Sequence, residues 1–207
     1  GALLLVQQPS WLGMLQTRGH DTQMRHDFVL AIRGRELGHL LNGFSQRLEK
    51  SGGTGELYQQ PMSLGTLTTG GVGYTYNGPK LDVLGLNHVL MAHSSGDRWG
   101  NKNHAAFDKD VFLQLMPDMF AVKPVPTLPR DRRHVFPFQY SFWQESLLQL
   151  DQDPRFLNSY TPVAIRLYVR HASSQKLATP LITAWLRTEF FNQIRHSTAS
   201  YTIEVIP

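Results

Sequence analysis

Residues 70–93 read GGVGYTYNGPKLDVLGLNHVLMAH, and this stretch decides how the rest of the chain is interpreted. It begins with glycines, which tolerate positive φ and a close approach of another backbone. An Asn-Gly-Pro turn signal and a short apolar run at 81–84 follow the glycines. The stretch therefore predicts a Gly-rich turn at 70–73 after a strand at 64–68, and then a second buried strand that Gly85 ends.

Asp82 is the acidic residue of that second strand. A buried carboxylate is costly unless hydrogen bonds or a counter-charge compensate it. We therefore expect Asp82 at the end of the strand, where it accepts hydrogen bonds from a neighbouring turn. A structural brace for the loop Gly85-Leu86-Asn87 is one interpretation, and contact with a ligand is the other.

The glycines do not form a nucleotide-binding fingerprint. The dinucleotide motif needs G-x-G-x-x-G between a strand and a helix, with an acidic residue about 20 residues further on. Here the spacing is G-G-x-G, and Asp82 comes too early. A GK[ST] phosphate-binding sequence is also absent from the chain. The sequence therefore gives little support to a nucleotide site.

The order of these features resembles the C-terminal soluble domains of multi-spanning GT-C-type glycosyltransferases. Such domains show an amphipathic helix, a strand that runs into a Gly-aromatic turn, and an Asp-x-x-Gly-Leu motif. An Ala-His or Ala-Arg pair follows, and then a helix that ends in Pro-Asp before another strand. The matching segments cover residues 37 to 122, less than half of the chain, and are Leu37–Leu48, Leu64–Tyr76, Asp82–Leu86, Ala92-His93, Phe107–Met116 and Pro117-Asp118.

The resemblance implies a specific function. In such enzymes the donor is a lipid-linked phosphate sugar, and the catalytic carboxylate lies on an outward loop between the first membrane helices, which no residue here matches. The chain would be a non-catalytic domain on the extracytoplasmic (periplasmic) side of a bacterial inner membrane. It would shape the entrance of the active site or bind the glycan acceptor. Many relatives carry an acid where this chain has Asn87-His88, so no role of that acid is transferred.

The same resemblance sets the expected partners. These are the membrane-spanning portion of the same polypeptide, a glycan or lipid-linked sugar, and an anionic membrane surface. We expect no cofactor, no metal and no catalytic residue in this chain. Asp82 and His93 match the family pattern as positions only.

Bulk composition fits one folded domain over residues 1–207. A chain of 207 residues with 41% hydrophobic and 17% charged residues can bury one sizeable core. Cysteine is absent, which excludes disulfides, zinc-thiolate sites and a cysteine nucleophile. No apolar run approaches the ~20 residues that span a bilayer. Residues 1–20 are interpreted as a linker from a preceding membrane helix, and the apolar residues 3–6 as the end of that helix or a first strand.

The net charge of +4 is concentrated in a few clusters. Residues 130–134 read RDRRH, and further arginines lie at 18, 25, 33 and 35. Such clusters are either solvated or attracted to anionic lipid headgroups. Because no RNP-like or helix-turn-helix pattern accompanies them, we expect no nucleic-acid partner.

Alternating helices and strands predict the fold class. We expect an α/β domain, a three-layer sandwich with a mostly parallel central sheet and helices on both faces. The expected helices lie at about 21–50, 105–116, from the aromatics after 137 to 150, at 154–159 and at 182–194. Further strands are expected at 119–122, 162–170 and 201–206, and a Pro-rich internal loop at 123–137. Glycines at 34, 38 and 43 each weaken the first helix by ~1 kcal/mol, so it needs tertiary support.

Sugar recognition uses flat aromatic rings beside planar polar groups. The substrate-binding candidates on this basis and from the resemblance are Tyr74, Tyr76, Asp82, Asn87, His88, His93, Trp99 and His104. Two alternatives stay open. In a free-standing α/β enzyme, His93, His104 and Asp108 would form a two-His-one-carboxylate metal set, although no H-E-x-x-H or G-x-S-x-G motif accompanies them. The other alternative is an interaction module without a ligand.

Overall fold

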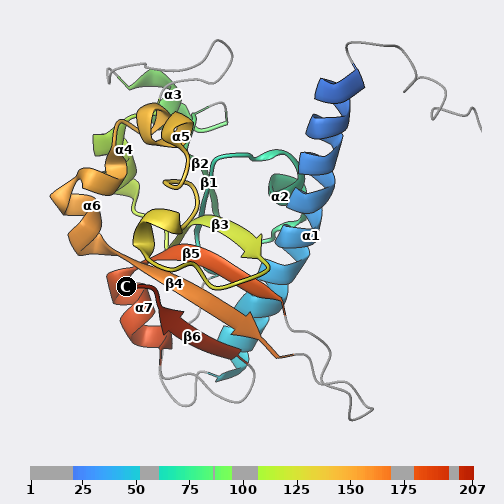
Figure 1. The fold of residues 1–207 in the computed structure, drawn as a ribbon, viewed down its shortest axis with the longest axis vertical. Helices are drawn as coiled ribbons and strands as arrows, with labels where there is room; N and C mark the ends of the chain where they lie inside the picture. The colour runs from blue at the N-terminus through green and yellow to red at the C-terminus, as the bar shows by residue number, and fades with distance from the viewer. Residues whose placement is uncertain (1–20, 52–60, 86, 95–106, 169–179, 196–200) are drawn as a thin grey trace, which may run out of the picture.

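The computed structural model describes residues 21–51, 61–85, 87–94, 107–168, 180–195 and 201–207. Within these ranges the strands form one six-stranded sheet in the order β2-β1-β3-β5-β4-β6 (Figure 1). The strands are β1 (Leu64–Thr66), β2 (Lys80–Asp82), β3 (Met119–Val125), β4 (Tyr160–Leu167), β5 (Leu181–Arg187) and β6 (Tyr201–Val205). β1 pairs in parallel with β2 and β3, whereas β3 with β5, β5 with β4, and β4 with β6 are antiparallel. The sheet is therefore mixed, and the expectation of a mostly parallel sheet was wrong.

The error comes from β5. Ile182, Leu186, Phe190 and Ile194 recur every four residues, which indicated one long helix. In the structure Leu181–Arg187 is a strand, and the helix α7 (Thr188–Ile194) begins only after it. A spacing of four places residues on one face of a helix, but it also equals two repeats of a strand. Because β5 is a strand, β4 pairs with it directly and antiparallel, from Tyr160 opposite Arg187 to Arg166 opposite Leu181.

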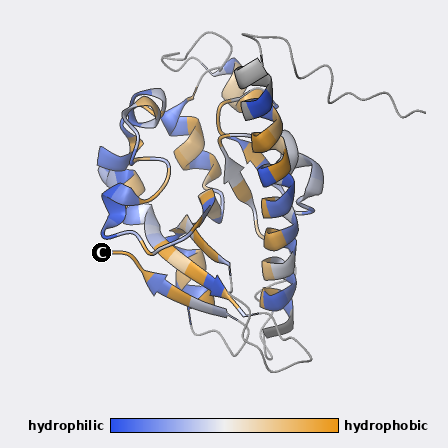
Figure 2. Cartoon of the chain, turned by 45° about the vertical axis from the view of Figure 1, so that its right-hand side comes forward, coloured by the Kyte–Doolittle hydropathy of each residue, from blue (hydrophilic) through white to orange (hydrophobic). Residues whose placement is uncertain are grey.

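Seven α-helices lie within the described part of the chain. They are α1 (Asp21–Ser51), α2 (Gly70–Thr75), α3 (Val89–His93), α4 (Lys109–Leu115), α5 (Ser141–Ser146), α6 (Pro154–Ser159) and α7, with short 3-10 turns η3 (Arg132–His134) and η4 (Leu150–Gln152). The predicted bounds of α1 and α6 are confirmed. Hydrophobic and hydrophilic residues are interspersed along the whole length of α1 (Figure 2).

Two other predicted helices are shorter than expected. The helix predicted from residue 105 begins at Lys109, because Asp108 caps it: its carboxylate accepts hydrogen bonds from the backbone N–H of Asp110 and Val111 at 2.9 and 3.0 Å. The helix predicted to reach Leu150 ends at Ser146. Two residues with positive φ, at 148 and 149, stop it before η4.

The glycine stretch and the Pro-rich loop also differ from expectation. Residues 70–75 form the helix α2 rather than a turn, and Gly85, with φ 81°, is the only described glycine with positive φ. The Pro-rich loop begins later than predicted, because β3 extends to Val125. Pro124 lies opposite Ile182 of β5 within that extension.

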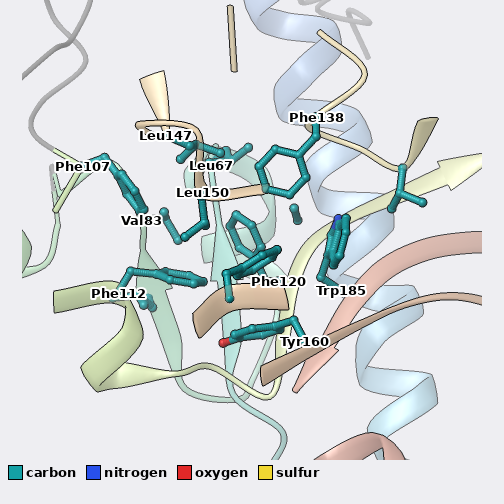
Figure 3. Packing of buried hydrophobic residues seen from close by; sticks show 14 of the residues in the cluster. Leu67, Val83, Phe107, Phe112, Phe120, Phe138, Leu147, Leu150, Tyr160 and Trp185 are labelled. Atoms are coloured by element: carbon teal, nitrogen blue, oxygen red, sulfur yellow. The ribbon is translucent and has the colours of Figure 1, made fainter. Parts of the chain in front are cut away.

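Apolar side chains pack on both faces of the sheet and form two clusters. Successive residues of β5 belong to different clusters, since neighbouring side chains of a strand point to opposite faces. Leu181 and Trp185 join an aromatic cluster that includes Phe112 of α4, Phe120 of β3 and Phe156 of α6 (Figure 3). Its rings meet edge to face, tilted or stacked; Phe138 and Trp185, for example, meet edge to face with centroids 5.3 Å apart. Members of the other cluster come from α1, α2, α7 and the sheet, and include Phe44, Val72, Ile182, Leu186 and Phe190.

Candidate functional site

Asp82 is the last residue of β2 and its carboxylate closes the loop that follows. The side chain is 4% exposed. Its Oδ1 accepts a hydrogen bond from Leu84 N at 3.2 Å, and its Oδ2 accepts bonds from the backbone N and the side-chain Nδ2 of Asn87 at 2.9 and 3.0 Å. The predicted brace at the strand end is therefore confirmed. We call residues 82–85 together with Asn87 the Asp82 turn.

The Asp82 turn also contacts the start of α2. The Nδ2 of Asn87 donates a second hydrogen bond, at 3.2 Å, to the hydroxyl of Thr69, the residue that precedes α2. The backbone pairing of β1 with β2 continues as far as the turn, since Val83 N donates a hydrogen bond to Thr66 O at 3.0 Å. The turn therefore lies at the carboxyl ends of the parallel strands β1 and β2. In open α/β sheets this edge is where ligands usually bind.

α3 follows the turn directly and places two of the candidate histidines. His88 is half-buried and caps the helix, because its Nδ1 accepts a hydrogen bond from Met91 N at 3.4 Å. His93, the last residue of α3, is exposed. Two apolar side chains between them are also exposed, Val89 by 73% and Leu90 by 54%. α3 thus presents an imidazole and an apolar surface beside the Asp82 turn.

The two candidate tyrosines have different environments. Tyr74 in α2 is 84% exposed. Tyr76 is 2% exposed, and its hydroxyl donates a hydrogen bond to the carbonyl of Met62. Burial, with the nearby Asp118 and Glu49 charges, raises the pKa of Tyr76, so the phenol stays neutral and keeps donating. Tyr74 can therefore meet a ligand at the surface, whereas Tyr76 is part of the core.

The remaining candidates are not brought together by the described residues. Trp99 and His104 lie outside the described part of the chain. Asp108 of the alternative metal set caps α4, as shown above. Within the described ranges, no group of three or more His, Cys, Asp or Glu side chains is arranged to hold a metal ion.

α2 itself is held in place by glycines that the sequence interpretation treated only as helix-weakening. A Cβ on Gly34 of α1 would lie 2.9 Å from Val72 N, and one on Gly38 would lie 2.0 Å from the hydroxyl oxygen of Thr75. Asn42, further along α1, donates from Nδ2 to Thr75 O at 2.7 Å. The backbones of α1 and α2 thus touch, and this contact fixes the position of α2 next to the Asp82 turn.

A second polar cluster lies at the opposite end of β1, and sequence reasoning missed it. Asp118 Oδ2 accepts hydrogen bonds from the N and Oγ of Ser63 at 2.8 and 2.7 Å, and its Oδ1 accepts one from Arg187 at 2.7 Å. The Pro117-Asp118 pair belongs to the motif described above, but nothing in the sequence pairs it with residues 55 and 69 positions away. Because these bonds tie β1, β3 and β5 together, the cluster is a structural clamp.

The basic segment 130–134 is organised by its own acid. Asp131 accepts hydrogen bonds from the side chain of Arg133 at 3.2 Å and from His134 Nδ1 at 2.9 Å. These bonds lower the pKa of Asp131 to about 2, so it is ionised at neutral pH. Arg132 N donates to the carbonyl of Pro207 at 2.7 Å. Part of the predicted charge cluster is therefore neutralised locally.

Comparisons with protein-family models, curated proteins and solved structures gave no significant match. In the part of the chain that the structure describes, no helix combines the length and apolar character needed to cross a bilayer.

Proposed function

We propose that this chain is the non-catalytic extracytoplasmic domain of a bacterial membrane glycosyltransferase, in which the Asp82 turn faces the entrance of the membrane active site. The observation that supports it most is the form of the Asp-x-x-Gly motif. Asp82 gives its carboxylate to the loop and holds Asn87 at the carboxyl edge of the parallel strands. The buried acid shapes the site, and its exposed neighbours meet the sugar.

The exposed groups on the turn and on α2 and α3, the two helices next to it, have the chemistry that a glycan needs. Tyr74 offers a flat ring, and His93 an imidazole. Asn87 donates both amide hydrogens inside the protein, to Asp82 and Thr69, so its Oδ1 is the atom that can accept a hydrogen bond from a sugar hydroxyl. These three side chains are the proposed acceptor or donor contacts.

The finer architecture belongs to the same proposal. We take the domain as a three-layer α/β arrangement, supported by the apolar clusters to which α1, α2 and α7 contribute on one face of the sheet and α4 and α6 on the other. A rigid layered body of this kind would hold the Asp82 turn at a constant orientation relative to the membrane part.

The proposal is tested first by the reading frame that encodes residue 1. We expect several membrane-spanning segments upstream, with an acidic residue on the first outward-facing loop. A frame that starts near residue 1 without such segments would overturn the proposal. It would also direct attention to the loop between His93 and Asp108.

A second experiment tests the site. The ¹⁵N-labelled chain is titrated by NMR with a short-chain prenyl-phosphate sugar and, in parallel, with free oligosaccharides. We expect shifts in the Asn87 side-chain amide, and weaker binding in Tyr74→Ala. Tyr168→Ala is the matched control, because Tyr168 is also an exposed tyrosine, 40% accessible, at the end of β4. Equal effects of the two substitutions would contradict a glycan contact at Tyr74.

A further inference from the structure

A bulge in β3 sets the direction in which Lys123 points. Phe120 lies opposite Trp185 of β5 and Lys123 lies opposite Thr183, so β3 advances by three residues where β5 advances by two. Ala121, inside this bulge, has a φ of 52°, which is strained for a residue with a side chain. Because side chains alternate along a strand, the extra residue moves Lys123 to the face of the sheet that carries Phe120 and Trp185.

On this face the ammonium group of Lys123 lies between two aromatic rings. Its Nζ is 5.0 Å from the ring centroid of Phe136 and 5.2 Å from that of Tyr140. Such cation–π contacts hold an ammonium group in place but leave its charge unbalanced. Among the described residues, no carboxylate forms an ion pair with Lys123. The half-buried charge is therefore stabilised by an anion that comes from outside these residues.

The hydroxyl of Tyr140 is a second donor for such an anion. Its oxygen accepts a hydrogen bond from Lys123 Nζ at 3.3 Å, so its own hydrogen is not used in that bond. Hydrogen bonds from the Gln139 side chain and from Lys123 lower the pKa of Tyr140, and a more acidic phenol is a stronger donor. Lys123 keeps two further N–H groups. The two side chains thus offer donors from neighbouring atoms, as the two oxygens of a carboxylate require.

Aromatic side chains continue the surface away from this pair. Tyr140 is 46% exposed and Phe142 is 41% exposed. The half-buried Trp143 packs edge to face against Phe136 and Phe142, with centroids 6.4 and 5.0 Å apart. Lys123 and these four rings therefore form one connected cluster, which we call the Lys123–Tyr140 site. A flat ring can stack on the C–H face of a sugar, while the adjacent ammonium group pairs with an acidic substituent.

We infer that the Lys123–Tyr140 site binds an acidic glycan, one whose sugar rings carry carboxylates. Lys123 and Tyr140 donate hydrogen bonds to a carboxylate, and a sugar ring stacks on the exposed aromatics. One ammonium balances the single charge of a carboxylate, whereas a phosphate monoester carries nearly two charges at neutral pH.

The inference goes beyond the proposed function, because it adds a second glycan-binding site and names the chemistry of its ligand. It rests on that proposal for the choice of a glycan among carboxylates. The position in the fold is compatible with a shared ligand. β3 runs parallel to β1, and Lys123 follows the residues of β3 that pair with β1, so it lies toward the same edge of the sheet as the Asp82 turn.

The test is isothermal titration calorimetry of the 207-residue chain with trigalacturonate and with its methyl ester, which has the same rings but no charge. We expect binding of the acid only, and weaker binding as salt is added. Lys123→Gln should weaken binding by about tenfold or more, and Tyr140→Phe by roughly two- to tenfold. Phe142→Ala should weaken it as well, because a stacking surface is lost.

The chain offers a matched control for each of the two polar substitutions. Lys80→Gln removes another exposed lysine that donates one hydrogen bond, to Tyr76 O at 2.8 Å. Tyr168→Phe removes another exposed tyrosine hydroxyl, which lies 3.3 Å from that of Thr202. Neither control should change trigalacturonate binding. Circular dichroism checks that each variant is folded, and Tyr140→Phe, which loses one exposed oxygen, decides the matter if Lys123→Gln does not fold.

Three results would overturn the inference. The first is equal binding, or no binding, of trigalacturonate and its methyl ester. The second is an equal loss of binding in Tyr140→Phe and in its control Tyr168→Phe. The third is binding of glutarate or of a poly-glutamate peptide as tight as that of trigalacturonate, because the site would then recognise a carboxylate without a sugar.

The outcomes also separate the two proposals. Membrane-spanning segments upstream of residue 1 combined with no trigalacturonate binding would remove the acidic-glycan site and leave the proposed function standing. Selective binding of trigalacturonate without such segments would do the reverse.

Discussion

The backbone of Gly71 packs directly against the carbonyl oxygen of Ala31: a Cβ on Gly71 would lie 1.9 Å from that oxygen. The hydroxyl of Thr75 extends the contact, since it lies 3.1 Å from the carbonyl oxygens of both Arg35 and Gly71. A side chain on Gly71 would force the two helices apart. Because Thr69 at the start of α2 is bonded to Asn87, α2 also connects α1 to the Asp82 turn.

Gly71→Ala should therefore destabilise the protein, although alanine favours helices. We expect a loss of about 1–3 kcal/mol in the free energy of unfolding, as for other overpacked sites. The measurement is equilibrium urea denaturation followed by circular dichroism.

The control for this variant is Gly43→Ala in α1, where a Cβ would meet no atom within 4 Å. Alanine there should stabilise the protein by roughly 0.5–1 kcal/mol, because glycine is the poorer helix former. If both substitutions changed stability in the same direction, the close contact between α1 and α2 would not be the cause.

Removal of the Asp118 carboxylate should be among the most damaging polar substitutions. Asp118→Ala would leave donors of Ser63 and Arg187 without their acceptor. The side chains of Asp118 and Arg187 are only 18% and 32% exposed, so water replaces the lost acceptor poorly. We expect a loss of about 3 kcal/mol in unfolding free energy. Arg166→Ala, on an exposed arginine of β4, should change it by less than about 0.5 kcal/mol. Similar losses in both variants would contradict the clamp.

The Asp82 turn contains one buried residue with a structural role, Asp82, and one residue at the surface, Asn87. Asp82→Ala should cost about 2–3 kcal/mol, because Leu84 N and Asn87 N lose a charged acceptor. Asn87→Ala should cost only about 1 kcal/mol, since the backbone bond to Asp82 remains. Urea denaturation with comparable m-values would make the comparison valid. A larger loss for Asn87→Ala than for Asp82→Ala would contradict the assigned roles.

Asp153 should make the stability depend on acid pH. The Arg155 side chain donates to both carboxylate oxygens, at 3.1 and 2.8 Å, and holds the pKa of Asp153 well below its ordinary value. A carboxyl with a lowered pKa in the folded state contributes stability above the unfolded-state pKa of about 3.9, and loses that contribution as the pH falls through the folded value.

Asp153→Asn, which keeps a side-chain cap for α6, should therefore be less stable than the parent at neutral pH. The difference should shrink as the pH falls below about 4. Thermal unfolding of the parent and the variant, from neutral pH to below pH 4, measures this difference in stability. A difference that stays constant with pH would mean that the charge on Asp153 contributes nothing.

Part of the candidate site could be predicted from sequence because its contacts are local. Asp82 and Asn87 are five residues apart, so the cost of burying an acid and the following Gly85 were enough to predict the brace. The link from Asn87 to Thr69 and the burial of Tyr76 against Met62 could not be predicted in this way. They depend on how α1 and α2 pack on the sheet. The sequence around a tyrosine that follows a run of glycines does not show whether its side chain faces water or the core.

The sequence by itself determined those elements whose apolar spacing, start or end is specified by their own residues. The apolar spacing of α1 and the Asp153-Pro154 start of α6 specify a helix locally, and Asp82 marks the end of a buried strand. Only the tertiary structure decided that residues 181–187 form a strand, because a period of four suits both a helix and a strand buried on two faces. It also decided that the glycines at 70–73 are helical, since their place against α1 comes from contacts about forty residues away. Because residues 181–187 form a strand, β5 pairs antiparallel with both β3 and β4, and the sheet is mixed.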